Sequence, residues 1–336
     1  MSENLKISVC VPYYNASAYI KEAIKSIEQQ TYENWELLVF NDGSTKKERD
    51  VLDNEINRIN NDARIIDSSN IGLFAARCKM FDAAKGDIII SLDADDYLFD
   101  NRAFEKVIEK FSSDNCDMTI YNNTRNNRGT LNKDFSKLNE NISNIKKYFC
   151  CEDNLNNIWI KAFKKSLFKD FPTNKNTKLN MCEDIYMSTF LLDKVNKVSL
   201  INEPLYYYRI NENSIVTKEF GKKRLEDQVL VEKNLCEYSK KWSIIDFSPE
   251  KHWFEFMVYG SLRFSYMNFK QKDRHAYYDL ILNNEYTKEM LKGLNEHLIK
   301  QMPKHKSLVI SKFNKRNYRA TDIIFWIIIK LSKLNS

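Results

Sequence analysis

Apolar runs of strand length alternate with helix-length amphipathic patterns over the first 110 residues of the chain. The expected strands cover residues 7–11, 35–40, 63–66 and 87–92, and the expected helices cover 16–29, 46–60 and 72–85. The 16–29 segment has apolar residues at positions 20, 23, 24 and 27, on one face of a helix, whereas the 46–60 segment is polar. Strand–helix alternation of this kind predicts right-handed βαβ units. We therefore expect an α/β fold in which helices flank a mainly parallel sheet.

An acidic cluster, Asp93-Ala94-Asp95-Asp96, directly follows the last of these strands. Three carboxylates within four positions repel one another unless protons or a cation neutralise them. A hard divalent metal takes oxygen ligands, and open α/β sheets bind their ligands at the carboxyl ends of the strands. The other interpretation is a solvated turn, because Asp favours turns. The cluster by itself does not decide between the two.

Polar segments also follow the neighbouring strands of the expected sheet. Pro12-Tyr13-Tyr14-Asn15 ends the first strand, Asn41-Asp42-Gly43-Ser44-Thr45 ends the second, and Asn70 to Arg77 opens the third helix. The carboxyl ends of parallel strands meet at one edge of a sheet, so we expect the four segments to face a single crevice. Each residue also has a structural alternative. Asp42 could be a turn former, Asn70 a helix N-cap and Arg77 an exposed helix residue.

In order and content, these four segments resemble those of family 2 glycosyltransferases, which have the A-type (GT-A, Rossmann-like) nucleotide-sugar fold. The resemblance is close over residues 6–112, is weaker over residues 155–216, and fades after that. It implies that Pro12, Tyr14 and Asp42 line the pocket for the base and ribose of the donor. A carboxylate suits uracil, because it accepts a hydrogen bond from the ring N–H.

The resemblance also implies roles for the third helix and for the acidic cluster. Asn70 and Arg77 would hold the nucleotide, with Arg77 near the ribose or phosphate. Asp93 matches the first Asp of the DxD motif of the family, close to ribose and metal, and Asp95 matches the second, the direct metal ligand. The implied metal is Mn²⁺ or Mg²⁺. The role of Asp96 stays open between positioning the site and capping the next turn.

A Glu183–Asp184 pair opens an expected helix over residues 182–193. Acidic residues are favoured at helix N-termini, so simple capping is the structural alternative. Glycosyl transfer needs a base, because the acceptor hydroxyl loses its proton as it attacks the anomeric carbon. The resemblance implies that Asp184 is this catalytic base and that Glu183 orients it or the acceptor.

A later segment, residues 206–214, resembles the part of the family that closes over the diphosphate. Arg209 and Ser214 are donors suited to that contact, and a surface loop after a strand is the alternative. Trp159 and the nearby tyrosines could stack on acceptor sugar rings, or they could belong to the core.

The implied function is inverting transfer of a sugar from a nucleotide donor, UDP-hexose or UDP-N-acetylhexosamine, to a saccharide acceptor. Capsule, lipopolysaccharide or another surface glycan would be the product, and the acceptor class includes lipid-linked saccharides. Two alternatives are weighed against it. A sugar nucleotidyltransferase needs a Gly-rich phosphate loop, and residues 12–15 contain no Gly. A basic nucleic-acid-binding protein is disfavoured because an Asp-lined crevice repels phosphates, so we expect no nucleic acid partner.

Charge divides the chain unevenly. Residues 1–110 carry 14 Lys and Arg against 20 Asp and Glu, whereas the rest carries 38 against 26. Residues 297–336 hold nine basic residues and one acid, Asp322. This basic end makes an anionic membrane surface a candidate partner. The scattered cysteines and the polar start of the chain predict reduced thiols and a cytoplasmic protein, peripheral on the inner face of the membrane.

We expect three regions: residues 1–112 bind the nucleotide sugar, residues 113–216 bind the acceptor and supply the base, and residues 217–336 form a helical C-terminal region. Further strands are expected at 116–121, 197–201 and 205–209, with Pro204 between the last two, and further helices at 219–240, 250–268, 273–283 and 287–300. An apolar stripe over residues 323–331, flanked by basic residues, fits a helix lying on an anionic bilayer. It fits a helix docked on the core of the protein equally well.

Overall fold

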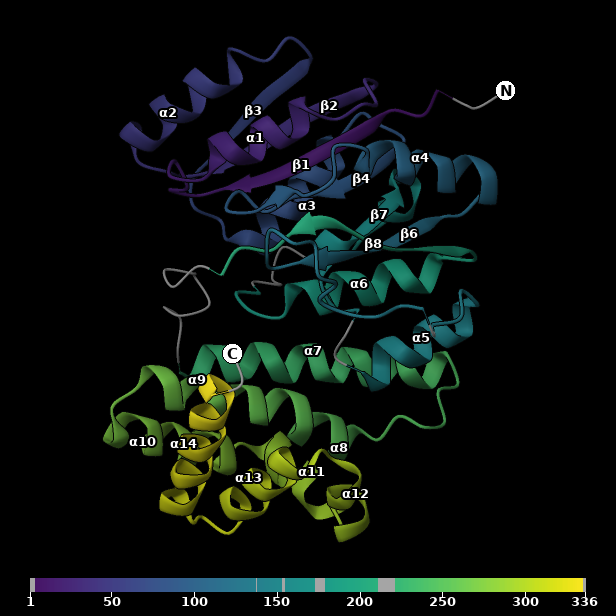
Figure 1. Cartoon of the computed structure of the whole chain (residues 1–336). Helices are drawn as coiled ribbons and strands as arrows, with labels where there is room; N and C mark the ends of the chain where they lie inside the picture. Colours follow the sequence, from purple (N-terminus) through teal and green to yellow (C-terminus); the bar gives the residue numbers. More distant parts are fainter. Residues whose placement is uncertain (1–3, 137, 153–154, 173–178, 211–220, 335–336) are drawn as a thin grey trace. The chain divides into compact units, whose positions relative to one another are not determined.

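The computed structural model of the chain describes residues 4–136, 138–152, 155–172, 179–210 and 221–334 (Figure 1). The chain forms two compact units, Met1–Glu212 and Asn213–Ser336. The first unit contains all strands of the described residues, and the second contains helices. The expected α/β fold with a mainly parallel sheet, flanking helices and a C-terminal helical region is confirmed.

The sheet of the first unit has eight strands in the order β3-β2-β1-β4-β7-β6-β8-β5. The strands are β1 Ile7–Tyr13, β2 Trp35–Asp42, β3 Asp62–Ser68, β4 Ile88–Ser91, β5 Tyr97–Leu98, β6 Met118–Thr124, β7 Lys161–Lys164 and β8 Val198–Tyr207. The first four in space run parallel, whereas β7 is antiparallel to both of its neighbours. The acidic cluster follows β4, the last strand of the parallel half. The fold therefore brings the cluster to the side of the sheet that carries the carboxyl ends of β1 and β2.

The helices of the first unit are α1 Ile20–Glu28, α2 Lys46–Ile56, α3 Leu73–Ala83, α4 Ala103–Asp114, α5 Ile142–Cys151 and α6 Glu183–Lys194. Helix α3 packs on β1 and β2, and α4 packs on β6 and β8. Every residue of β2 and of β4 is buried, as expected for parallel strands that are covered on both faces. This packing explains why those strands are mostly apolar.

The two strands expected at 197–201 and 205–209 are a single strand, β8, and the expectation of a break at Pro204 is wrong. The ladder between β8 and its parallel partner β6 shifts register on either side of Asn122, which faces Pro204. A proline cannot donate to a ladder, so the strand passes it through a local irregularity rather than ending there. The short strand β7 was not expected from the sequence.

The second unit consists of helices: α7 Lys222–Lys241, α8 Pro249–His252, a π-helical turn at Trp253–Val258, α9 Tyr259–Asn268, α10 Gln271–Asn283, α11 Glu285–Gly293, α12 Glu296–Gln301, α13 Lys304–Asn314 and α14 Tyr318–Leu334. The helix expected at 287–300 is wrong in one respect, because it is divided into α11 and α12. Asn295 interrupts it, since its side chain caps α12 by accepting from the Leu298 N–H at 3.0 Å. Among the described residues, none of these helices is both long enough and apolar enough to cross a membrane.

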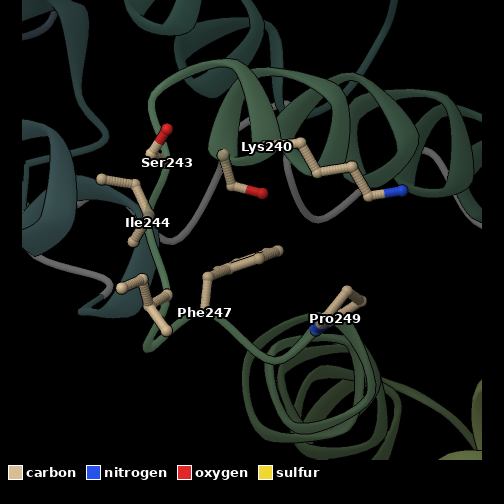
Figure 2. Close-up of a pocket in the computed structure, with 7 residues that line it drawn as sticks. Lys240, Ser243, Ile244, Phe247 and Pro249 are labelled. Atoms are coloured by element: carbon tan, nitrogen blue, oxygen red, sulfur yellow. The ribbon is translucent and has the colours of Figure 1, made fainter.

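A shallow cavity of about 240 Å³ lies between the end of α7 and the start of α8 (Figure 2). Its lining is mainly apolar, with Ile244, Phe247 and Pro249 around it and Lys240 at its rim. No carboxylate, histidine or cysteine lines it. Among these described residues, Lys240 is therefore the one titratable side chain in the lining, and the lining does not have the oxygen or nitrogen donors of a metal site.

Candidate functional site

The register of the sheet places the polar segments at one edge of the first unit. Cys10 of β1 is level with Leu38 of β2 on one side and with Ser91 of β4 on the other. Strand β4 ends at this level, whereas β1 continues to Tyr13 and β2 to Asp42. Asp42, at the end of β2, and Asp93, two residues beyond β4, therefore lie toward the same edge of the sheet. The single crevice expected from the sequence rests on this register.

Asp42 holds the segment that precedes helix α3 in place through two hydrogen bonds. Its two carboxylate oxygens accept the N–H groups of Ile71, at 2.7 Å, and Gly72, at 2.9 Å. The neighbouring Gly43 has a φ of 75°, and a Cβ there would lie 2.6 Å from the Asn70 backbone nitrogen, so only glycine allows the two segments to meet. Asp42 is thus a structural residue of the crevice wall whose oxygens retain further acceptor capacity.

The other residues expected in the donor pocket lie around this contact. Tyr14 and Asn70 are exposed, and Pro12 is half-buried. Asn70 is not the N-cap of α3, because Gly72 occupies that position. The family pattern often has an acid at position 41, and Asn41 instead donates to Asp67 at 2.8 Å. An acid at position 41 would face the Asp67 carboxylate, so the amide avoids a like-charge contact.

Arg77 joins the two halves of the site. One terminal nitrogen donates to Asp93 Oδ1 at 2.7 Å, and the other donates to Glu183 Oε1 at 2.9 Å and to Asp184 Oδ1 at 2.5 Å. Its side chain is only 1% exposed, compared with 25% for Asp93, 12% for Glu183 and 22% for Asp184. The alternative of an exposed helix residue is wrong. The guanidinium is a buried cation that holds three carboxylates together.

Burial and mutual repulsion change the protonation of these groups. Burial, followed by the neighbouring Asp184 charge, raises the pKa of Glu183 to about 7. Burial also raises the pKa of Asp184, although the Arg77 charge opposes the shift. Burial disfavours the charge on Arg77, but the three carboxylates outweigh it and raise the Arg77 pKa. Near neutral pH Glu183 is therefore partly protonated, a state suited to acid–base chemistry.

The backbone conformation just before helix α6 sets the position of the Glu183–Asp184 pair. Cys182, which precedes the helix, has a left-handed φ of 61° and makes no side-chain cap. A non-glycine residue in this region is strained, and such strain gathers at functional sites. Glu183 and Asp184 then occupy the first turn, and both carboxylates accept from Arg77. Simple capping does not account for the pair.

Lys161 is a site residue that the sequence reasoning missed. It is fully buried and donates from Nζ to the carbonyls of Leu155, at 2.5 Å, and Asn157, at 2.6 Å. Burial lowers its pKa to about 7, while the nearby Asp184 charge opposes that shift. The sequence does contain a signal for this residue, which is a lysine inside the apolar run 158–163. A lysine is almost never fully buried unless its ammonium group has partners. Lys161 thus adds a second basic side chain close to Asp184.

Asp96 supports the acidic cluster from beneath. It is 2% exposed, and its oxygens accept the Tyr206 hydroxyl at 2.7 Å and the Arg209 N–H at 2.7 Å. The same hydroxyl accepts the Asp93 N–H at 3.2 Å. Burial, with repulsion from Asp93 next, raises the pKa of Asp96 to about 8. This arrangement favours a positioning role for Asp96 over contact with a ligand.

Arg209 lies against the acidic cluster, whereas Ser214 is outside the described residues. Arg209 Nε donates to the Asp95 carbonyl at 2.8 Å, and its guanidinium forms an ion pair with Glu22. Trp159 is 5% exposed and stacks on Tyr206, with ring centroids 4.5 Å apart. These contacts favour the core role for Trp159 and place the Arg209 charge beside Asp95.

Tyr206→Phe is expected to lower the free energy of unfolding by about 1–3 kcal/mol, because it leaves a buried oxygen of Asp96 without its donor. Chemical denaturation of the ligand-free protein measures the change. Tyr14→Phe is the matched control, since an exposed hydroxyl should matter by less than about 0.5 kcal/mol. Equal stabilities of the two variants would contradict the support assigned to Asp96.

The carboxylates of the cluster suit a hard divalent cation. Asp93 and Asp95 are half-buried oxygen donors at the strand edge, the ligand chemistry that Mg²⁺ and Mn²⁺ prefer. Within the described residues, no group of three or more His, Cys, Asp and Glu forms a complete metal cage. One or two carboxylates are what a Mg²⁺ site uses when substrate phosphates complete the coordination. The residues therefore fit a metal that is bound together with a diphosphate.

Residues 8–172 match the sequence model of the Glycosyl transferase family 2. The chain carries a family 2 glycosyltransferase domain. The putative glycosyltransferase EpsH of Bacillus subtilis is 28% identical over 235 residues, 67% of this chain and 66% of EpsH. The minor teichoic acid biosynthesis protein GgaB of the same organism is 28% identical over 226 residues, 63% of this chain and 24% of GgaB. The chain thus spans less than two thirds of either relative.

Solved glycosyltransferase structures share the fold of this chain. S. aureus TarS 1–349 in complex with UDP-GlcNAc has a TM-score of 0.66 and 15% identity, covering 97% of this chain and 92% of TarS. The mannosyltransferase PcManGT from Pyrobaculum calidifontis, in complex with GDP-Man and Mn²⁺, has a TM-score of 0.50 and 14% identity, covering 96% and 86%. The GT-A fold expected from the resemblance is confirmed.

Proposed function

We propose that this glycosyltransferase moves a sugar, with inversion, from UDP-hexose or UDP-N-acetylhexosamine to a saccharide hydroxyl during synthesis of a bacterial surface glycan. The Arg77 bridge carries the proposal, because it puts Asp93, beside the presumed leaving group, and Asp184, the presumed base, on one cation. The names of the relatives support the product class, and the UDP-GlcNAc bound to TarS supports the donor class.

In the proposed reaction, Asp184 removes the proton of the acceptor hydroxyl while that oxygen attacks the anomeric carbon. The bond from this carbon to the donor phosphate breaks, and the nucleoside diphosphate leaves with the bonding electrons. Attack opposite to the leaving group converts an α-linked donor into a β-glycoside. The positive charge of Arg77, and of Lys161 when it is protonated, favours the carboxylate form of Asp184 and opposes the rise that burial causes in its pKa.

The donor would lie along the strand edge, with residues 1–112 holding it and residues 113–216 supplying the acceptor side. Pro12, Tyr14 and Asp42 would contact the base and ribose, and Asn70 would contact the nucleotide. Arg209, already beside Asp95, has a guanidinium suited to the diphosphate. We assign Arg77 to positioning the carboxylates rather than to direct nucleotide binding, because its side chain is only 1% exposed and both terminal nitrogens donate to carboxylates.

Asp95, with Asp93 beside it, would hold the divalent metal, Mn²⁺ or Mg²⁺. The bound cation would supply positive charge that stabilises the departing diphosphate. Asp95→Ala is therefore expected to lower donor turnover by at least about 100-fold, which corresponds to the several kcal/mol that such charge stabilisation is worth. Release of nucleoside diphosphate from UDP-sugars, with Mn²⁺ and with a chelator, measures the loss.

A binding measurement separates the metal role from general damage. Calorimetry of UDP binding should show a dependence on Mn²⁺ in the wild-type protein and none in Asp95→Ala. Asp50→Ala, at an exposed position of helix α2, is the matched control and should behave like wild type. Mn²⁺-dependent UDP binding that survives in Asp95→Ala would reject this assignment.

The proposal extends to where the reaction takes place. Surface glycans are commonly built on lipid carriers, so a lipid-linked saccharide is the proposed acceptor and the inner face of the cell membrane the proposed location. An acceptor assay that compares a free oligosaccharide with the same oligosaccharide on a lipid diphosphate tests this part. Equal rates would show that the lipid does not contribute to recognition.

A further inference from the structure

Helix α14 is docked on its own unit through one side. Phe325 is fully buried, with its ring centroid 5.5 Å from that of Tyr266 and 5.7 Å from that of Tyr259, both on α9. Asp322 accepts from Arg274 of α10 at 2.7 Å. The helix also packs along α13 (Figure 1). The core-docking interpretation therefore holds for the side of α14 that carries Asp322 and Phe325.

The opposite side of α14 is an exposed apolar face. The side chains of Ile323, Trp326, Ile327 and Leu331 are 59%, 55%, 43% and 55% exposed. Their spacing of three and four residues puts them on one face of the helix. Ile324 and Ile328, which the sequence pattern also placed in this stripe, are half-buried instead. Four large apolar side chains gathered on one exposed face mark an interaction surface rather than scattered exposure.

Basic residues border this face. Arg319 lies one turn before Ile323, and Lys330 lies one turn after Trp326, with its Nζ 4.9 Å from the Trp326 ring centroid. Arg319 and Lys330 are both exposed. Asp322, the single acid of residues 297–336, is turned inward to Arg274. The face thus combines an apolar centre, an indole and a cationic border.

We propose that the Ile323, Trp326, Ile327 and Leu331 face of α14 binds an anionic lipid bilayer, with the helix lying in the plane of the membrane surface. An apolar face bordered by Lys and Arg and anchored by Trp is the composition of interfacial helices. A second copy of the chain fits the face poorly, because symmetric pairing would bring the two cationic borders together. The inference rests on the second unit alone and does not depend on the proposed chemistry.

Co-sedimentation of the full chain with vesicles tests the proposal. Vesicles of two parts phosphatidylcholine to one part phosphatidylglycerol should bind the protein at low salt, and pure phosphatidylcholine should bind it at least tenfold more weakly. The double variant Ile323→Asp with Ile327→Asp should lose binding to the anionic vesicles at least tenfold. Ile245→Asp is the matched control, because Ile245 is 95% exposed elsewhere in the same unit, and it should bind like wild type.

The outcomes decide the matter in either direction. Circular dichroism should show that the double variant keeps its helices, because both substitutions are at exposed positions. Failure of the wild-type chain to bind anionic vesicles, or equal binding by the double variant, overturns the proposal. Sedimentation equilibrium tests the competing occupant of the face, a second copy of the chain. A dimer that the same double variant dissociates would assign the face to a second copy and would likewise overturn lipid binding.

Discussion

Asp184→Asn is expected to lower sugar transfer by about 10²–10⁴-fold, the range that a positioned general base contributes. The amide keeps the size of the side chain but cannot take the acceptor proton. Arg77 keeps its contacts with Asp93 and Glu183, so the fold should remain intact. The measurement is the rate of nucleoside diphosphate release with a saturating acceptor, together with circular dichroism of the variant.

The pH dependence of the wild-type rate gives a second readout. A base acts only when deprotonated, so the rate of transfer should rise with pH. Because burial raises the pKa of Asp184, this rise should lie above the ordinary aspartate value of about 3.9. The residual activity of Asp184→Asn should not show this rise with pH. Asp193→Asn, at the other end of α6, is the control with near wild-type activity, and substantial transfer by Asp184→Asn would remove Asp184 as the base.

Arg77→Met is expected to lower the free energy of unfolding by about 3–5 kcal/mol near neutral pH, the usual cost of removing one partner from a buried ion pair. The substitution leaves Asp93, Glu183 and Asp184 close together without their shared cation. Because these carboxylates include the proposed base, transfer should also fall by orders of magnitude. Chemical denaturation at several pH values measures the stability.

The sign of the pH effect is fixed by these carboxyl groups. Burial already raises the pKa of Glu183 to about 7, and the loss of Arg77 raises carboxyl pKa values further. Between about 4.3, the unfolded glutamate value, and the raised folded value, the folded chain binds more protons than the unfolded chain. The stability of the variant therefore falls as pH rises through this range, and its deficit relative to wild type shrinks toward pH 5.

A surface arginine is the control for this prediction. Arg49 pairs with Asp67 at 2.8 Å, where the side chains are 25% and 56% exposed. Exposed ion pairs contribute about 0–1 kcal/mol, so Arg49→Met should change stability little and with no marked pH dependence. If Arg77→Met proved as stable as Arg49→Met, the Arg77 bridge would not organise the site.

The sequence predicts the parallel half of the sheet well, because its signals are local. Short apolar runs such as 37–40 are typical of strands that are buried on both faces, and the polar residues after them are expected at the strand ends. The Asp42 and Asp93 segments were located in this way. The resemblance added residue roles that no periodicity contains, among them the base assigned to Asp184.

The long-range contacts could not be predicted in this way. Arg77 and Asp184 are 107 positions apart, and only the folded chain shows that one guanidinium holds both Asp184 and Asp93. Lys161 lies in a short antiparallel strand within an otherwise ordinary apolar run. The apolar stripe predicted for α14 also combined residues of its docked side with residues of its exposed side. Helical spacing of apolar residues does not show which side docks on the protein. That choice depends on where Asp322 and Phe325 find partners.

Release of nucleoside diphosphate from a panel of nucleotide sugars tests the central claim most directly. The purified chain, supplied with Mn²⁺, should turn over one donor or a few related donors, and most rapidly a UDP-sugar. Asp184→Asn should bind that donor with unchanged affinity but release the diphosphate at least about 100-fold more slowly. A wild-type chain that neither binds nor turns over any nucleotide sugar, with or without the metal, would contradict the account.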